Sequence, residues 1–328
     1  MIETQQHLVD NLFSKEIKQE PIRVGFGRGL LEAGHVNKHV VALCADLTAS
    51  TKMDDFAKSY PDRFVEVGVA EQNLVTAAAG MALAGKIPFV SSYAAFSPGR
   101  NWEQIRTTIC LNDTNVKVVG SHAGVSVGPD GATHQMLEDI ALMRVLPNMT
   151  VVVPADALEA EKATKVLAST KGPAYIRLAR EKSPIITTDK TPFSLSKAQV
   201  LRAGKDVTIV ACGTMVYQSL VAAEKLSKKG IEAEVINAAV VKPLDYITIT
   251  ASARKTGAVV TVEEAQAAGG LGGAVAEALA EHYPAPMTRI GMHDRFGESG
   301  TPDELLEYFG LTAPHIAKAA QELIKRKA

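Results

Sequence analysis

The sequence contains few cysteines, no long apolar run and no excess of charge of one sign. Cys44, Cys110 and Cys212 lie far apart in apolar stretches and form no CxxC pair, so we expect three buried thiols rather than a metal or redox site. No apolar run approaches the roughly 18 residues that span a bilayer, and residues 1–20 lack the apolar core of a signal peptide. These absences favour a soluble protein of the cytoplasm.

The balance of charge excludes another group of functions. Thirty-five lysines and arginines face 36 aspartates and glutamates, so the chain has no overall attraction for nucleic acid or anionic lipid. An anionic substrate would have to be bound by local arginines. The length of 328 residues, with 46% apolar and 22% charged residues, suits about two globular domains.

The alternation of short β-branched runs with longer amphipathic segments predicts an α/β fold with two domains, each a mostly parallel sheet flanked by helices. Prolines and Ser/Thr residues interrupt this pattern at 181–197, so we expect domains at 1–183 and 199–328 and a linker at 184–198. The expected strands are 39–44, 63–67, 88–92, 116–120, 150–153, 173–177, 207–212, 232–236, 258–263 and 287–291. The expected helices are 20–34, 70–85, 100–111, 155–169, 215–228, 270–281 and 302–325.

A carboxylate opens one of the expected helices. Glu71, in VGVAEQN, lies where a strand gives way to the apolar stretch LVTAAAGMALAG. A glutamate there can simply complement the positive end of the helix. It also lies at the edge of a parallel sheet where α/β folds bind ligands, and a partly buried, protonatable carboxylate is the functional reading.

Two aromatic residues follow the next strand. Tyr93 and Phe96, in SYAAFSPGR, are spaced three apart in a loop. Aromatic residues at such spacing usually belong to the core, and the alternative is a flat platform for a ligand.

The stretch SHAGVSVGPDGATHQ concentrates His122, Asp130 and His134 among several glycines, which let backbone approach a ligand closely. Two histidines twelve residues apart do not match a common zinc spacing, so we expect a polar catalytic loop without metal, or else a surface turn. The second domain also has a glycine-rich loop, at 262–273. It matches neither phosphate-binding pattern, and close packing of helix on sheet explains its glycines as well.

Together these segments resemble a known family. VGVAEQN, SYAAF, SHAGVSVGPDGATHQ and LPNMTVVVPAD, in this order and spacing, resemble the pyrimidine-binding and C-terminal domains of transketolases from about Arg23 to about Phe309. The chain looks like the C-terminal subunit of the transketolases that are split into two polypeptides. The resemblance implies thiamine-diphosphate-dependent transfer of a two-carbon ketol unit from xylulose 5-phosphate to ribose 5-phosphate or erythrose 4-phosphate, in the pentose phosphate pathway.

The resemblance also implies roles for individual residues. Glu71 would contact N1′ of the aminopyrimidine and activate the cofactor, which requires a protonated carboxyl and a pKa raised by burial. Tyr93 and Phe96 would enclose the pyrimidine, with Asp46 near the cofactor. The third aromatic of the family pattern is Gly99 here, which leaves open whether Trp102 replaces it.

The remaining matched residues would bind the sugars. His122 and His134 would hydrogen-bond the oxygens around the reacting carbon and move protons, while Asp130 would read the C2 hydroxyl of the acceptor. Arg23, Ser50 and Arg180 match phosphate-binding residues, and the rigid fork of arginine suits a terminal phosphate.

One part of the family pattern is missing. Full-length transketolases bind the cofactor's diphosphate and Mg²⁺ through a GDG motif, whereas the nearest string here is PDG at 129–131 in the substrate loop. We therefore expect a partner subunit that carries GDG and the Mg²⁺ ligands. The expected assembly is an α2β2 heterotetramer, or a self-dimer when the chain is alone.

Three alternatives remain open. A subunit like 1-deoxyxylulose-5-phosphate synthase usually has an acidic residue and arginine where this chain has Ser121 and His122, and a 2-oxo acid dehydrogenase β subunit lacks the context of His134. A non-catalytic, partner-binding paralogue would not need Glu71, both histidines and the phosphate-binding residues together.

Overall fold

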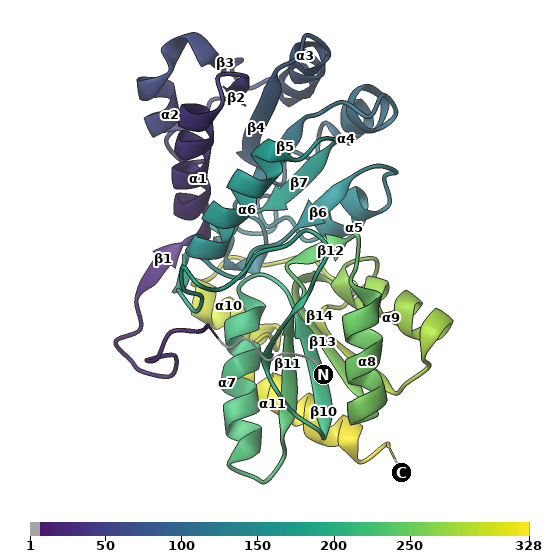
Figure 1. Ribbon diagram of the computed structural model, residues 1–328. Coiled ribbons are helices and arrows are strands. Elements are labelled where there is room, and N and C mark those ends of the chain that lie inside the picture. Colours follow the sequence, from purple (N-terminus) through teal and green to yellow (C-terminus); the bar gives the residue numbers. More distant parts are fainter. Residues whose placement is uncertain (1–6, 328) are drawn as a thin grey trace.

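The computed structural model describes residues 7–327, which form two sheets, one above the other in Figure 1. The upper sheet has the order β12-β6-β7-β5-β4-β2-β3, parallel except for β12, and the lower has the order β14-β13-β10-β11-β9, parallel except for β9. The upper strands are β2 (Val40–Cys44), β3 (Phe64–Glu66), β4 (Ile87–Tyr93), β5 (Lys117–Ser121), β6 (Thr150–Val152), β7 (Ala174–Arg177) and β12 (Val240–Lys242). The lower strands are β9 (Gln199–Arg202), β10 (Val207–Ala211), β11 (Ala233–Asn237), β13 (Val259–Gln266) and β14 (Met287–Met292).

Helices cover both faces of each sheet, which confirms the predicted two-domain α/β fold. On the first sheet, one face carries α1 (Ile22–Val36), α2 (Asp54–Ser59) and α6 (Ala157–Ser169), and the other carries α3 (Glu71–Leu83), α4 (Trp102–Gln104), the π-helical turn η2 (Ile105–Cys110) and α5 (Asp139–Arg144). On the second sheet, α7 (Met215–Ser227) and α11 (Ala313–Ile324) lie opposite α8 (Tyr246–Thr256) and α9 (Leu271–His282). Strands β1 (Gln19–Pro21) and β8 (Lys182–Pro184) form a separate antiparallel pair.

One predicted helix was wrong and several elements were missed. The helix expected at 302–325 is divided into α10 (Pro302–Tyr308) and α11, because Gly310 takes a left-handed conformation (φ 72°) and ends the first helix. Helix α8 was not predicted, because its stretch YITITAS is rich in β-branched residues. Local caps hold α8 instead, with the Asp245 carboxylate accepting from the Thr248 amide at 3.2 Å and Gly257 in the left-handed region.

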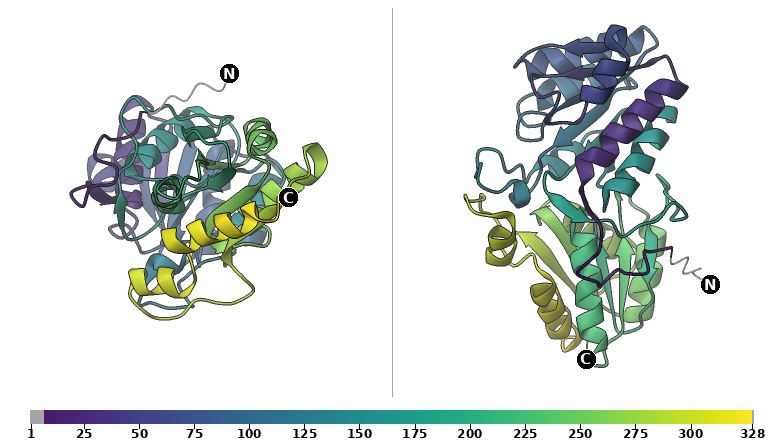
Figure 2. Two further views of the ribbon diagram at one scale, coloured as in Figure 1. Left: turned by 90° about the horizontal axis from the view of Figure 1, so that it is seen from below. Right: turned by 90° about the vertical axis from the view of Figure 1, so that its left-hand side faces the viewer.

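Three segments tie the two domains together. Strand β12 leaves the second domain and pairs with β6 at the edge of the first sheet. The N-terminal segment runs along the second domain (Figure 2), where Leu12 and Ile17 join its hydrophobic core. The expected linker is fastened by Asp156, whose carboxylate accepts from the amides of Ile186 and Thr187. Because these contacts cross the expected boundary, the domain limits of 1–183 and 199–328 remain a prediction.

The three cysteines are unpaired and buried, as expected. Burial raises the pKa of Cys110 to about 11, so its thiol stays protonated and unreactive at neutral pH. Within residues 7–327, no helix combines the length and the apolar character needed to cross a bilayer.

A buried carboxylate at the domain boundary makes the stability of the chain depend on pH. Glu159 of α6 accepts from the Asn237 side chain of the second domain at 2.8 Å, and burial, followed by the charge of Asp156, raises the pKa of Glu159 to about 7. The folded chain thus holds a proton that the unfolded chain releases between about pH 4.5 and pH 7. Folding stability is therefore lost as pH rises through that window.

Between pH 5 and pH 8 we expect the unfolding free energy of the wild type to fall by about 2–4 kcal/mol more than that of Glu159→Gln. Urea unfolding of both chains at the two pH values measures this difference. Glu32→Gln is the control, because Glu32 is 52% exposed and should leave the pH dependence unchanged. The same change of unfolding free energy with pH in wild type and Glu159→Gln would contradict the raised pKa of Glu159.

Candidate active site

The expected site residues gather at one edge of the first sheet. In a parallel sheet the carboxyl ends of the strands meet at a common edge, and loops leaving that edge carry the ligand-binding groups. Asp46 and Ser50 follow β2, Glu71 follows β3, Tyr93 ends β4, His122 follows β5 and Arg180 follows β7. Arg23 joins them from the first turn of α1. The sheet topology therefore brings residues from six segments to one place.

Glu71 lies in the first turn of α3 and is 2% exposed. Its Oε2 accepts from Nη1 of Arg100 at 2.6 Å, and its backbone oxygen accepts from the Asn101 amide at 2.8 Å. The carboxylate is thus buried, as expected, but it is also ion-paired. A ligand that bonds this oxygen would meet the guanidinium of Arg100 beside it.

Tyr93 and Phe96 form a half-buried aromatic surface beside Glu71. Their ring centroids are 6.2 Å apart with planes 21° from parallel, and the Arg100 guanidinium lies 4.9 Å from the centroid of Phe96. Gly99 admits no side chain, since a Cβ there would come within 2.2 Å of the Ala95 carbonyl oxygen. The aromatic residue missing from the motif is therefore not replaced at that position, and Arg100 covers Phe96 instead.

Trp102 is not part of this surface. Its ring packs against the hydrophobic core, and its indole N–H donates to the Leu142 carbonyl at 2.9 Å. The open question of whether Trp102 completes the aromatic pocket is thereby answered in favour of a structural role.

The two histidines approach the aromatic rings from the loop after β5. The ring of His122 stacks on Tyr93 with centroids 3.9 Å apart, and that of His134 lies edge-on to Phe96 at 5.4 Å. His122 has a left-handed backbone (φ 56°), and its Nδ1 is 2.9 Å from Oγ of Ser121. Burial, followed by the charges of Arg23 and Arg180, lowers the pKa of His122 to about 3. His122 is consequently neutral at physiological pH and serves as a hydrogen-bonding group.

The positive groups lie next to the histidines. Arg23 donates through Nη1 to the Ser50 carbonyl at 2.6 Å and through Nε to the Arg180 carbonyl at 3.2 Å, while Arg180 lies 3.6 Å from the Asp130 carboxylate. Burial, followed by the charge of Arg180, lowers the pKa of Arg23. Such a pair favours an anionic group between them.

Asp46 lies at the rim of this edge. Its side chain is exposed, its backbone is left-handed (φ 60°), and its amide donates to the Glu66 carboxylate at 2.7 Å. Of the expected site residues, Asp46 and Asp130 are the exposed ones, open to solvent-borne or partner groups.

Comparison with known families explains this arrangement. Residues 19–185 match the model described as "Transketolase, pyrimidine binding domain", and residues 196–316 match "Transketolase, C-terminal domain". This chain belongs to the transketolase family. It is a transferase, like the other members with which it aligns over nearly its whole length.

Two relatives of about the same length as this chain are a section and a subunit of transketolases. The chain is 44% identical over 309 residues to the "Putative transketolase C-terminal section" of Methanocaldococcus jannaschii, which covers 93% of this chain and 97% of that protein. It is 44% identical over 315 residues to a 6-deoxy-6-sulfo-D-fructose transketolase subunit of Clostridium sp. strain MSTE9, covering 96% and 98%. A solved structure described as "Split gene transketolase, inactive beta4 tetramer" superposes with a TM-score of 0.87 at 46% identity, covering 95% of this chain and all of that one. The chain thus corresponds to the C-terminal subunit of a split transketolase, which needs a partner subunit.

The glycine-rich loop of this transketolase subunit serves packing. The Glu263 carboxylate accepts from the amides of Leu271 and Gly272, both at 2.7 Å, and thereby fills the N-terminus of α9. A Cβ at Gly270 would come within 2.1 Å of that carboxylate. The structural interpretation of the loop is confirmed, and the phosphate-binding one is wrong.

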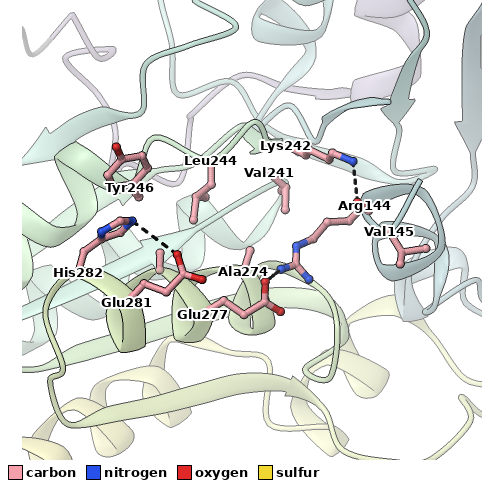
Figure 3. Close-up of a pocket in the computed structure, with 11 residues that line it drawn as sticks. Arg144, Val145, Val241, Lys242, Leu244, Tyr246, Ala274, Glu277, Glu281 and His282 are labelled. Atoms are coloured by element: carbon pink, nitrogen blue, oxygen red, sulfur yellow. Dashed lines mark hydrogen bonds and ion pairs between the residues drawn. The ribbon is translucent and has the colours of Figure 1, made fainter. Parts of the chain in front are cut away.

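A separate cavity of about 480 Å³ lies where the two domains of the transketolase subunit meet (Figure 3). Arg144 pairs there with Glu277, and the rings of Tyr246 and His282 stack with centroids 4.2 Å apart. Lys242 donates to the carbonyls of Arg144 and Leu146. None of the expected site residues lines this cavity, so its polar groups belong to the contact between the domains.

The sequence patterns missed two residues of the site. Arg100 follows the aromatic motif, but nothing local indicated that its guanidinium reaches Glu71, 29 residues earlier in the chain. Gln135 follows His134, and no pattern in the sequence indicated a role for it. Its side chain donates to the carbonyls of Val125 and Gly128.

Proposed function

We propose that this transketolase subunit transfers a two-carbon ketol unit between sugar phosphates, at an active site completed by its partner. The observation that carries the proposal is the grouping of Glu71, an aromatic surface, a neutral histidine and a pair of arginines at one sheet edge. These groups match, in type, the needs of an aminopyrimidine, a ketose hydroxyl and a sugar phosphate.

The residues fit the pyrimidine half of thiamine diphosphate. Glu71 is a buried carboxylate that can share a proton with a ring nitrogen, and Tyr93 and Phe96 offer flat faces for a ring beside it. When bound, the cofactor supplies a nucleophilic carbon that carries the two-carbon fragment. Arg100, which pairs with Glu71 and lies over Phe96, is proposed to give way to the ring, and Asp46 is proposed to lie near the cofactor from the exposed rim.

The histidines and arginines are proposed to bind the sugar. Neutral His122 can donate or accept at a ketose oxygen, and His134, which shares a hydrogen bond with Thr133 and lies 6.3 Å from the centroid of Tyr93, can do the same. Asp130 is proposed to accept from the acceptor's C2 hydroxyl. Arg23, Ser50 and Arg180 are proposed to hold the terminal phosphate.

The partner is proposed to supply the GDG motif, the diphosphate site and the Mg²⁺ ligands in an α2β2 assembly. An apolar helix face supports this proposal. After its polar first turn EQN, the α3 sequence LVTAAAGMAL is apolar apart from Thr76, yet the helix buries only Glu71, Leu74, Val75, Ala78 and Ala79. Leu83 at its end is 76% exposed. By analogy with the β4 tetramer of its relative, we propose that the chain pairs with itself when the partner is absent.

The preferred donor is proposed to be xylulose 5-phosphate, with ribose 5-phosphate or erythrose 4-phosphate as acceptor. A relative's name specifies a sulfonated fructose, and sulfonate and phosphate both suit an arginine pair. The test mixes the purified chain, its GDG-bearing partner, thiamine diphosphate and Mg²⁺ with each donor, and follows the released aldose.

We expect activity in the complete mixture to be highest with xylulose 5-phosphate, and Arg180→Ala to raise KM for it about tenfold or more, because one charged hydrogen bond to the phosphate is lost. Lys190→Ala, a change in the exposed part of the linker, is the control. Preference for the sulfonated donor would overturn the substrate assignment but not the reaction class.

A further inference from the structure

The second domain reaches into the loop that carries both histidines. We define residues 121–136, between β5 and α5, as the substrate loop. Glu264, on β13 of the second domain, is 3% exposed, and its Oε1 accepts from the backbone amide of Ser126 in this loop at 2.7 Å. Its Oε2 accepts from Oγ1 of Thr214 at 3.0 Å. The carboxylate therefore bridges its own domain and the loop, 138 residues earlier in the chain.

A glycine makes this approach possible. Gly124 has φ +93°, and a Cβ built there would come within 2.3 Å of Oε1 of Glu264. Any other residue would therefore be strained in backbone and would also collide with the carboxylate. The loop is shaped to receive Glu264.

Two further sets of hydrogen bonds connect the same loop to the second domain. The Gln135 side chain donates to the Glu298 carbonyl at 2.9 Å as well as to the Val125 carbonyl at 3.0 Å. Buried Arg177 donates to the carbonyls of Glu264 at 2.9 Å and Met136 at 3.3 Å. The middle and the end of the substrate loop are thus held by groups that contact the second domain.

We propose that the second domain acts in catalysis by holding the substrate loop, with Glu264 as the positioning residue. The Ser126 amide lies between His122 and His134, so its bond to Glu264 fixes the stretch from which both imidazoles project. Catalytic groups displaced by about 1 Å can cost on the order of 10²-fold in rate.

The neighbouring residue provides the matched control. Glu263 is equally buried on the same strand, but its carboxylate bonds only the amides at the start of α9 within the second domain. Adjacent residues of a strand point to opposite faces. Shortening Glu263 to aspartate thus disturbs a buried carboxylate of the neighbouring residue without touching the substrate loop.

The test separates the length of the side chain at position 264 from its charge. Glu264→Asp keeps the charge but is one methylene too short to reach Ser126, whereas Glu264→Gln keeps an acceptor oxygen at full reach. Hydrogen exchange of the isolated chain is followed for residues 121–136. We expect the loop amides to exchange at least tenfold faster in Glu264→Asp, to stay near wild type in Glu264→Gln, and to be unchanged in Glu263→Asp.

A kinetic measurement on the assembled enzyme follows, and it rests on the function proposed above. Glu264→Asp should lower kcat about 10- to 100-fold while the affinity for thiamine diphosphate stays within about twofold, and Glu264→Gln should restore kcat. Equal loop exchange in Glu264→Asp and wild type, or equal loosening by Glu263→Asp, would overturn the proposal. An inactive wild-type assembly would instead refute the proposed function, and loop exchange would still decide the role of Glu264.

Discussion

Glu71→Gln is expected to lower kcat of the assembled transketolase by about 10²- to 10⁴-fold, the usual contribution of a positioned acid or base. Glutamine keeps the shape of the side chain and an oxygen that can accept from Arg100, so the fold should be preserved. It cannot exchange a proton with a ring nitrogen, and that proton is what the proposed role requires. Steady-state kinetics with saturating cofactor and both sugars measures the loss.

Two controls make this result specific. Glu103→Gln removes a carboxylate from the exposed surface of α4 and should leave kcat unchanged. Thermal unfolding of the Glu71→Gln chain should stay close to wild type, because the buried hydrogen bonds are retained. A Glu71→Gln enzyme with more than about a tenth of wild-type kcat would remove Glu71 from cofactor activation.

The second large effect is expected at His122. His122→Ala removes a hydrogen-bonding group from the loop after β5 and the ring stacked on Tyr93, and should lower kcat/KM by about 10²- to 10³-fold. Because the pKa of His122 is lowered to about 3, this residue stays neutral over the working range. The acid limb of the wild-type rate profile between pH 5 and pH 8 should therefore not arise from His122.

The matching control is His39→Ala, since His39 is exposed in the same domain. Kinetics of both variants from pH 5 to pH 9 test the assignment. A loss confined to low pH in His122→Ala would mean that His122 acts as a charged group, contrary to its burial between two arginines. A similar loss in both variants would point to a general effect on folding.

The sequence predicted best those site residues that lie in contiguous motifs. Glu71, Tyr93, Phe96, His122 and His134 each lie in a motif that carries the resemblance to transketolases, although the single motifs also admitted structural interpretations. The parallel sheet then requires that loops from neighbouring strands meet at one edge. Both the fold class and the composition of the edge were therefore accessible without coordinates.

Contacts between distant segments could not be predicted in this way. The bonds of Arg100 to Glu71 and of Glu264 to Ser126 depend on how helices and domains pack, and no local pattern specifies them. Strand β12, three residues long, was too short for its periodicity to register. The π-helical turn η2 was likewise expected as ordinary helix, because one extra residue per turn leaves little trace in composition.

The central claim is that this chain holds only the pyrimidine half of a cofactor site, and equilibrium binding tests it most directly. Thiamine diphosphate would be titrated, with Mg²⁺ present, into the chain alone, the GDG-bearing partner alone and an equimolar mixture. We expect saturable binding in the mixture that is at least tenfold tighter than to either subunit alone, and weaker when the mixture contains Glu71→Gln. Binding to the isolated chain as tight as to the mixture would contradict the account.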